Sequence, residues 1–512
     1  MPAQKAAPHA YDEGVDALPY MSLPLEYAQP ATLAAHAVLF GHRAPGAERA
    51  RVLELGCASG GHIIPLAARF PDARFLGVDF DAREIETGQR RIAALGLANI
   101  ELRTGDIATL SLPEAGFEYV ICHGVFSWAP DTVRDAILRL AARTLVEDGV
   151  AAISFNVLPG WHVQEIVRDL CLHHGAGTDA PEARIGKVRA VLRAVAEGAS
   201  GQTPYGLAMR QAAQRIATRP ASYILGEFLA AESRAFFFEE FAAAAAAQGL
   251  FYLCDGYLKA SAPEFFRPSQ AALMRQLAGD DAAKLERVAD EFTGRTFRRA
   301  ILCKAKPTRR VPLNPPTSVL ADLSYSCGYF RDSKADKNGP PAFRDAFGNT
   351  LRLNNAALAA ALDQLAQIHP RTARPAELAG GGGLDRLCRN LFRLAAEGRV
   401  QISTLPLGSG AARDGRPVGY RVAREEHARG QKWVSTRQHR AVGLDADMRA
   451  IFAALDGSAD HAALAALLRA PDCPPDQAQA LNGDHAALPE TAEQRLERAL
   501  RTLERNALLE PG

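Results

Sequence analysis

The sequence predicts an α/β protein whose N-terminal half is built on a doubly wound, mostly parallel sheet. Between residues 51 and 156, short apolar runs alternate with helical segments, which is the pattern of parallel strands joined by helices. A glycine-rich turn directly follows the first of these runs. Two later strand-like runs, 250–258 and 298–306, flank a helical patch and could close the same sheet. Ligands bind at the carboxyl ends of the strands in such folds.

Each element of this half follows from a local signal. The runs expected to form strands are RVLELG (51–56), ARFLGVDF (73–80), NIELRTGD (99–106), FEYVICHG (117–124) and DGVAAISFN (148–156). The helices expected around them span 31–40, 62–70, 81–95 and 131–145. Gly41 closes the first helix, and Asp81 can cap the third by accepting hydrogen bonds from its free N–H groups. Residues 162–240 and 262–292 are expected to be mainly helical.

The two ends of the chain differ from the sheet region. Residues 1–30 contain several prolines and tyrosines without helical periodicity, so we expect an arm, in which 11–27 lie over the ligand. KPTRRVPLNPPT (306–317) is interpreted as a linker because of its proline density. A chain ending near Pro307 is therefore expected to fold by itself. Residues 318–512 are expected to form a mostly helical, winged-helix-like region, with helices at 355–367, 384–399, 445–456, 461–469 and 491–506.

Composition excludes several classes of protein. Lys and Arg total 59 against 58 Asp and Glu, so the net charge of +1 argues against a nucleic-acid coat protein, and no nucleic-acid partner is expected. No uncharged apolar stretch is long enough for a membrane span, and the N-terminus lacks a signal peptide. The eight cysteines form no CxxC pair, which predicts reduced thiols in the cytoplasm and no metal site.

The strongest chemical signal is the segment VLELGCASGG (52–61). Gly56 and Gly60 let the backbone approach a ligand, and the free N–H groups of the next helix can point at that ligand. A carboxylate at Glu54 would repel the pyrophosphate of a dinucleotide. It favours a ligand that carries a positive charge or an amino group.

Acidic residues after the next two strands narrow the choice of ligand. Asp79 ends the second strand, where an acid can accept hydrogen bonds from ribose hydroxyls. Asp106 follows the third strand beside the apolar Ile107, where it can hold an adenine amino group. An adenosyl ligand with a cationic amino-acid end satisfies these acids together with Glu54. S-adenosylmethionine is that ligand.

On these residues the sequence resembles the class I S-adenosylmethionine-dependent methyltransferases. The resemblance is carried by ELGCASG (54–60), Asp79 and GD (105–106), and it covers about 51–156 plus the late strands. It implies a Rossmann-like fold, with a mostly parallel seven-stranded sheet and helical insertions. Ala58 stands where the family has the second glycine of its motif, which leaves less room beside the ligand.

Other segments are similar to bacterial methyltransferases that carry a regulatory domain after the catalytic fold. This subgroup includes rickettsial protein-lysine methyltransferases that act on outer-membrane proteins. The segments concerned are YDE…PY (11–20), HGVFSW (123–128), N-x-x-PGWH (156–162), YILGEFL (223–229), 236–253 and 294–303. The implied organisation is an arm at 1–30, a cofactor-binding core at 31–160, a helical regulatory segment at 161–306 that supplies the last two strands, and the C-terminal region at 318–512.

The site residues are expected at the carboxyl ends of the strands. The cofactor-binding set is Glu54, Gly56, Ala58, Gly60, Asp79, Phe80, Asp106, Ile107, His123 and Tyr20. His123 and Asn156 are the candidates for a catalytic role, although each could instead be a core or turn residue. Aromatic side chains that could guide a cationic acceptor are Tyr11, Phe126, Trp128 and Trp161.

The expected activity is methyl transfer from S-adenosylmethionine to lysine amines of a protein. Two alternatives stay open, a methyltransferase for a small molecule and a cofactor-binding regulator without turnover. The expected partner is accordingly a protein or a small-molecule methyl acceptor. A homodimer stays open as an assembly.

Overall fold

The structure, a computed structural model, describes residues 22–176, 180–261, 263–279, 281–305, 314–335, 339–380, 383–469 and 490–511. Tyr11, Tyr20 and most of the predicted linker lie outside the described residues. Within them, no helix is both long and apolar enough to cross a bilayer.

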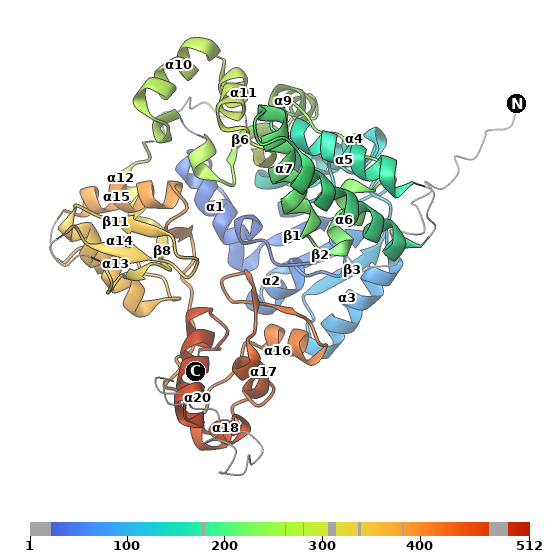
Figure 1. The fold of residues 1–512 in the computed structure, drawn as a ribbon. Helices are drawn as coiled ribbons and strands as arrows, with labels where there is room; N and C mark the ends of the chain where they lie inside the picture. Colours follow the sequence, from blue (N-terminus) through green and yellow to red (C-terminus); the bar gives the residue numbers. More distant parts are fainter. Residues whose placement is uncertain are drawn as a thin grey trace, which may run out of the picture.

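A seven-stranded sheet forms the centre of the N-terminal half (Figure 1). Its strands are β1 (Arg51–Leu55), β2 (Arg74–Asp79), β3 (Ile100–Thr104), β4 (Phe117–Cys122), β5 (Leu145–Asn156), β6 (Phe251–Asp255) and β7 (Phe297–Cys303). Their order is β3-β2-β1-β4-β5-β7-β6, with parallel pairing from β3 to β5 and antiparallel pairing of β7 with β5 and β6. The predicted fold class is confirmed. The strand order reverses between β1 and β4, so their carboxyl ends flank the crevice where such sheets bind ligands.

Helices cover both faces of the sheet, which is why its central strands are apolar on both sides. The helices α1 (Pro30–Leu39), α2 (Ile63–Arg69) and α3 (Ala82–Leu95) pack on one face, and α4 (Asp131–Thr144) and α9 (Phe238–Ala247) pack on the other. Asp81 caps α3 as predicted, because its side chain accepts a hydrogen bond from the backbone N–H of Arg83. Helices α1 to α4 begin and end within a few residues of their predicted bounds.

The middle of the chain adds helices beside the sheet. They are α5 (His162–Gly175), α6 (Pro181–Gly198), α7 (Pro204–Ala217), α8 (Ala221–Tyr223), α10 (Pro268–Ala278) and α11 (Ala282–Thr293). Helices α5 to α7 enclose a separate apolar core that includes Val167, Leu192 and Met209. This insertion therefore packs largely within itself, and β6 and β7 return the chain to the sheet.

The C-terminal half forms two units. The first contains α12 (Thr317–Asp322), β8 (Ser324–Ser326), β9 (Phe330–Arg331), β10 (Ala342–Arg344), β11 (Thr350–Arg352), α13 (Ala356–Ile368), α14 (Pro375–Leu378), α15 (Leu384–Ala396) and β12 (Gln401–Ser403). The second contains α16 (Arg421–Ala428), β13 (Trp433–Ser435), β14 (Ala441–Gly443), α17 (Ala446–Phe452), α18 (His461–Leu467) and α20 (Ala492–Arg505). The five predicted helices are found as α13, α15, α17, α18 and α20, whereas α12, α14 and α16 were not predicted. The short strands β8 to β11, β13 and β14 were also missed, because two or three residues show too little alternation.

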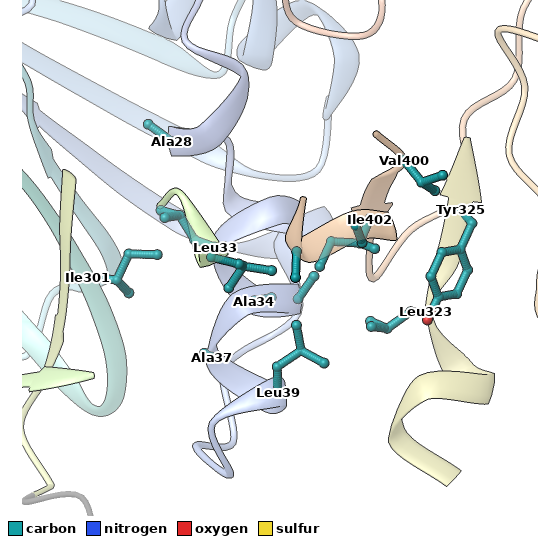
Figure 2. Close-up of a cluster of buried hydrophobic side chains, with 14 of the residues drawn as sticks. Ala28, Leu33, Ala34, Ala37, Leu39, Ile301, Leu323, Tyr325, Val400 and Ile402 are labelled. Atoms are coloured by element: carbon teal, nitrogen blue, oxygen red, sulfur yellow. The ribbon is translucent and has the colours of Figure 1, made fainter. Parts of the chain in front are cut away.

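Helix α1 lies between the sheet and the first C-terminal unit (Figures 1 and 2). Every residue of α1 except Val38 is buried. Figure 2 shows Leu33 on the side of Ile301 from β7, with Ile402 and Tyr325 of the C-terminal unit on the opposite side. All four side chains belong to one continuous apolar core that runs from the sheet to residue 402. The expectation that the chain up to Pro307 folds by itself therefore conflicts with this shared core.

The second C-terminal unit docks on helices α2 and α3 through buried polar contacts. Arg91 of α3 forms salt bridges with Glu425 at 3.2 Å and Glu426 at 2.6 Å, and all three side chains are buried. The hydroxyl of Tyr420 donates to the backbone oxygen of Pro65 in α2 at 3.2 Å. The unit encloses its own apolar core, so these contacts attach an already packed body to the helices behind the glycine-rich turn.

Candidate active site

The glycine-rich turn after β1 has a backbone that only small residues tolerate. Gly56, Ala58 and Gly60 have φ values of 76°, 44° and 75°. A Cβ atom on Gly56 would lie 2.3 Å from Cγ2 of Val125, which follows β4. The turn thus needs glycine at position 56 for steric as well as conformational reasons. Ala58 keeps a positive φ where the family motif has glycine.

Asp79 at the end of β2 holds this turn in place. One carboxylate oxygen accepts a hydrogen bond from the backbone N–H of Ala58 at 2.8 Å, and the other accepts from the backbone N–H of Asp81 at 3.0 Å. Burial raises the pKa of Asp79, and these two hydrogen bonds act in the opposite direction. Each oxygen has a second lone pair, so the carboxylate could still accept from ribose hydroxyls. Asp79 therefore fixes the turn, and its predicted contact with the ribose stays a prediction.

Glu54 is a buried carboxylate that is only partly satisfied. The residue is 4% exposed, and its Oε2 atom has no hydrogen-bond partner among the described residues. Burial, with a smaller contribution from Asp79, raises the pKa of Glu54 well above its ordinary value. A buried acceptor without a partner is costly unless a ligand supplies a donor. This oxygen is suited to a cationic amino group, and the sequence-based assignment of Glu54 to that group stays a prediction.

The predicted adenine-binding residues lie at the neighbouring strand ends. Ile107 is buried, whereas Asp106 is exposed, and Oδ1 of Asp106 accepts from the backbone N–H of Ala108 at 2.8 Å. The ring of Phe80 is exposed directly after β2. The side chains of Phe80 and Ile107 follow neighbouring strands, so they could hold the two faces of a planar base.

The last described part of the predicted arm lies on the glycine-rich turn. Oγ of Ser22 accepts from the backbone N–H of Gly61 at 2.7 Å, and a Cβ atom on Gly61 would lie 2.0 Å from the backbone oxygen of Ser22. The backbone N–H of Leu25 donates to Nδ1 of His62 at 3.2 Å. Residues 22–27 therefore cover the start of the helix after the turn. Tyr20, which was expected to face the cofactor, lies outside the described residues.

His123 stands at the carboxyl end of β4 and contacts the same segment. Its Nδ1 atom shares a hydrogen bond of 2.8 Å with the hydroxyl of Tyr27, the last residue of the covering segment. Burial and the nearby guanidinium of Arg299 lower the pKa of His123 to about 4, so the imidazole is neutral at pH 7. A neutral imidazole can accept or donate a hydrogen bond there without adding charge.

The other predicted residues differ in how accessible they are. Asn156 is buried, with its Nδ2 atom unpartnered among the described residues. Trp128 and Trp161 meet edge to face with ring centroids 6.1 Å apart. Phe126 is buried in the core against Phe155, Phe236 and Phe241. It was expected at the acceptor pocket, but the structure buries it in the apolar core, where these three rings surround it.

Comparisons with known proteins agree with this site. A model of a methyltransferase domain matches residues 52–149, which contain the turn and the acidic strand ends. An uncharacterized protein of Rickettsia prowazekii is 30% identical over 233 residues, covering 45% of this chain and 92% of that protein. The chain belongs to the S-adenosylmethionine-dependent methyltransferases. The predicted cofactor, S-adenosylmethionine, is confirmed with the family.

Two further segments of the methyltransferase match family models. Residues 220–304 match a predicted methyltransferase regulatory domain, and 415–508 match the C-terminal winged helix domain of PKMT. A second uncharacterized protein of Rickettsia prowazekii is 28% identical over 475 residues, covering 88% of this chain and 84% of that protein. The winged-helix expectation is thereby confirmed for the last unit.

Solved structures share the whole fold of this methyltransferase. PKMT2 from Rickettsia typhi superimposes with a TM-score of 0.81 at 23% identity, covering 96% of this chain and 100% of that chain. The same protein in complex with AdoHcy gives a TM-score of 0.82. At this identity the likeness establishes a common fold.

Sequence analysis did not single out several residues around the turn. Ser22, Tyr27 and Arg299 reach the site from segments far apart in the chain, so no local motif marks them. His62 directly follows the glycines of the motif, and this position was the one available signal.

Proposed function

We propose that this methyltransferase acts on lysine amines of a protein. The observation that carries the proposal is the likeness of the whole chain, from sheet to winged helix, to the structure of PKMT2 from Rickettsia typhi. A catalytic domain alone would not need the regulatory and winged-helix units. Those units add surface on which a folded protein could dock beside the site.

The residues at the strand ends would hold the cofactor. We assign the unpartnered oxygen of Glu54 to the cationic amino group and the turn 56–61 to the adjoining backbone contacts. Asp79 would accept from the ribose, and Asp106 with Ile107 and Phe80 would hold the adenine. When bound, S-adenosylmethionine supplies a methyl group on a sulfonium that needs no further activation.

The remaining task of the protein is to present a neutral amine. A lysine amine can accept a methyl group only after it has lost its proton, and burial lowers an amine's pKa because it penalises the charged form. The neighbourhood of His123 has this character, since burial and Arg299 already lower the pKa of that imidazole to about 4. The aromatic rings of Tyr27 and Phe297, both in contact with His123, would guide the amine.

The covering segment would exclude water from the reaction. Ser22, Leu25 and Tyr27 contact the turn, His62 and His123 directly, so they close one side of the crevice. Exclusion of water strengthens the alignment of the amine with the methyl group, because competing hydrogen bonds are removed. We infer that the arm acts as this cover.

A small-molecule acceptor is the second candidate. It is favoured by a cavity of about 520 Å³ that reaches His123, a size typical of small-molecule sites. The third possibility from the sequence, a regulator without turnover, has no observation in its favour within the described part of the chain.

One experiment separates these functions. The protein is incubated with methyl-labelled S-adenosylmethionine and a bacterial lysate, and labelled protein bands are hydrolysed for methyllysine. Methyllysine supports the proposal, label in extractable small molecules supports the second candidate, and cofactor binding without transfer supports a regulator. The control is the variant Gly56→Val, which should give no labelled product, because Val125 leaves no room for a side chain in the glycine-rich turn.

A further inference from the structure

A cavity lies between the sheet, helix α1 and the C-terminal half. Its volume is about 520 Å³, and it is lined by segments that the sequence places far apart. The lining includes Tyr27, His36, His123, Arg299, Gln401 and Arg440. Because His123 and Tyr27 form its wall at the carboxyl end of β4, the cavity adjoins the place proposed for the acceptor amine.

The permanent charges that line this cavity are unbalanced. Arg440 is paired with Glu26, Nε to Oε2 at 2.7 Å. Arg69 donates instead to neutral oxygens, those of the Gln29 side chain at 3.0 Å and the Arg437 backbone at 3.2 Å. Arg299 makes no salt bridge within the described part of the chain. Two guanidinium groups therefore leave the cavity with uncompensated positive charge.

Arg299 lies against the two aromatic rings that contact His123. Its guanidinium carbon lies 5.4 Å from the ring centroid of Tyr27 and 5.5 Å from that of Phe297. Those two rings contact the imidazole of His123. Asp255 accepts from the backbone N–H of Arg299 at 3.2 Å, but its carboxylate is paired with Arg295 at 3.4 Å. The planar fork of Arg299 is thus available to an incoming ligand.

A second, independent observation marks the opposite wall. His36 of α1 is 5% exposed and lines the cavity, and its Nδ1 atom has no hydrogen-bond partner among the described residues. Buried polar atoms are usually partnered, so an orphan in a cavity wall indicates a missing ligand or water. The guanidinium of Arg299, which has no salt bridge in the described part of the chain, and the unpartnered imidazole nitrogen of His36 both suit a ligand that offers oxygen acceptors.

We propose that this cavity binds a carboxylate of the acceptor molecule next to its reactive amine, with Arg299 as the principal ligand. This inference rests on the proposed function, so the acceptor is a lysine with an aspartate or glutamate side chain close to it. The arrangement serves the reaction in two ways. The cation attracts the acidic neighbour, and it disfavours an ammonium beside His123, which promotes the neutral amine.

The test compares two peptides on the full-length protein. Each has one lysine, flanked on both sides by glutamates in the first and by glutamines in the second. We expect kcat/KM to be about tenfold or more higher for the glutamate peptide, as for other hydrogen bonds to charged groups. Arg299→Gln should reduce this preference to about twofold or less, and Arg299→Lys should retain part of it because the charge remains. Arg90→Gln, an exposed arginine on α3, should keep the full preference.

Peptide binding is measured in parallel by fluorescence anisotropy without cofactor, which gives a readout that does not depend on turnover. Equal kcat/KM for both peptides would overturn the carboxylate site and leave lysine methylation intact. If neither peptide is methylated, the lysine proposal fails for such acceptors, and equal Kd values would then also remove the carboxylate site. If free glutarate binds with a lower Kd than the glutamate peptide, the site belongs to a small acid and the peptide assignment is overturned.

Discussion

His62 and His439 share a hydrogen bond of 2.7 Å between Nδ1 of His62 and Nε2 of His439. Nδ1 of His62 also accepts from the backbone N–H of Leu25 at 3.2 Å, so this atom is unprotonated and His439 is the donor. The covering segment, the helix after the glycine-rich turn and the winged-helix unit therefore meet at one imidazole. Both rings are buried.

This pair predicts a pH-dependent stability. Burial lowers the pKa of His62 to about 3 in the folded protein, whereas an unfolded histidine has a value of about 6.5. The stabilisation is therefore present above about pH 6.5 and is lost progressively as the pH falls towards 3. Between pH 7 and 5, His62→Asn should lose about 2 kcal/mol less of its unfolding free energy than the wild type. Urea denaturation measures this, with exposed His174→Asn as the control; equal losses in His62→Asn and wild type would contradict it.

Glu54→Gln tests the assignment of the orphan carboxylate. We expect cofactor affinity to fall about tenfold or more, since the variant loses a hydrogen bond between charged groups. Stability should be unchanged or slightly higher, because a buried carboxylate without a full set of partners is removed. Calorimetric titration and thermal unfolding measure the two effects, and exposed Glu114→Gln is the control. An unaltered Kd in the folded variant would exclude Glu54 from the site.

Arg91 anchors the winged-helix unit to α3. Arg91→Ala removes the salt-bridge partner of the buried Glu426, which keeps its hydrogen bonds from Ser435. Glu425 keeps a salt bridge to Arg429 at 3.4 Å. The loss of the buried pair should cost about 3 kcal/mol of stability. Arg90, its neighbour, has a side chain that is 68% exposed, so Arg90→Ala should change stability by less than about 0.5 kcal/mol. Denaturant unfolding compares the two variants, and similar losses would show that the buried contact is not the anchor.

A chain that ends after Cys303 tests the shared core. Removing the C-terminal half exposes the face of α1 that packs on Tyr325 and Ile402, so we expect aggregation or loss of cooperative unfolding. Differential scanning calorimetry and light scattering measure both. A chain ending after Ser403, which keeps the first C-terminal unit, should unfold cooperatively. A monomeric, cooperatively folding product from the shorter chain would restore the boundary expected from the linker.

Removal of residues 1–27 tests the cover. Turnover should fall at least about tenfold, because Ser22, Leu25 and Tyr27 no longer exclude water from the crevice. The point variant Tyr27→Phe serves as the milder comparison, since it deletes only the hydrogen bond to His123. Single-turnover rates at saturating cofactor separate chemistry from binding. Full turnover by the truncated protein would rule out a covering role.

The sequence was sufficient for the features that rest on local patterns. The sheet, the cap at Asp81 and the glycine-rich turn each depend on residues close together in the chain, so apolar periodicity and a motif reveal them. Even the two late strands could be assigned to the sheet, because they bracket a helical patch. The type of ligand followed from Glu54, because a carboxylate at this position of the motif disfavours a pyrophosphate and favours an amino group.

Only the tertiary structure decided which distant segments meet. Arg299, His36 and Tyr27 face one cavity, and Arg91 meets Glu426, because helices and units far apart in the sequence pack together. Phe126 is buried in the core because rings from distant segments pack around it. From the sequence alone, an aromatic residue near a strand end could line a pocket or pack in a core. Helix α1 is likewise buried between the sheet and the first C-terminal unit, which a local pattern such as the proline-rich segment 306–317 could not show.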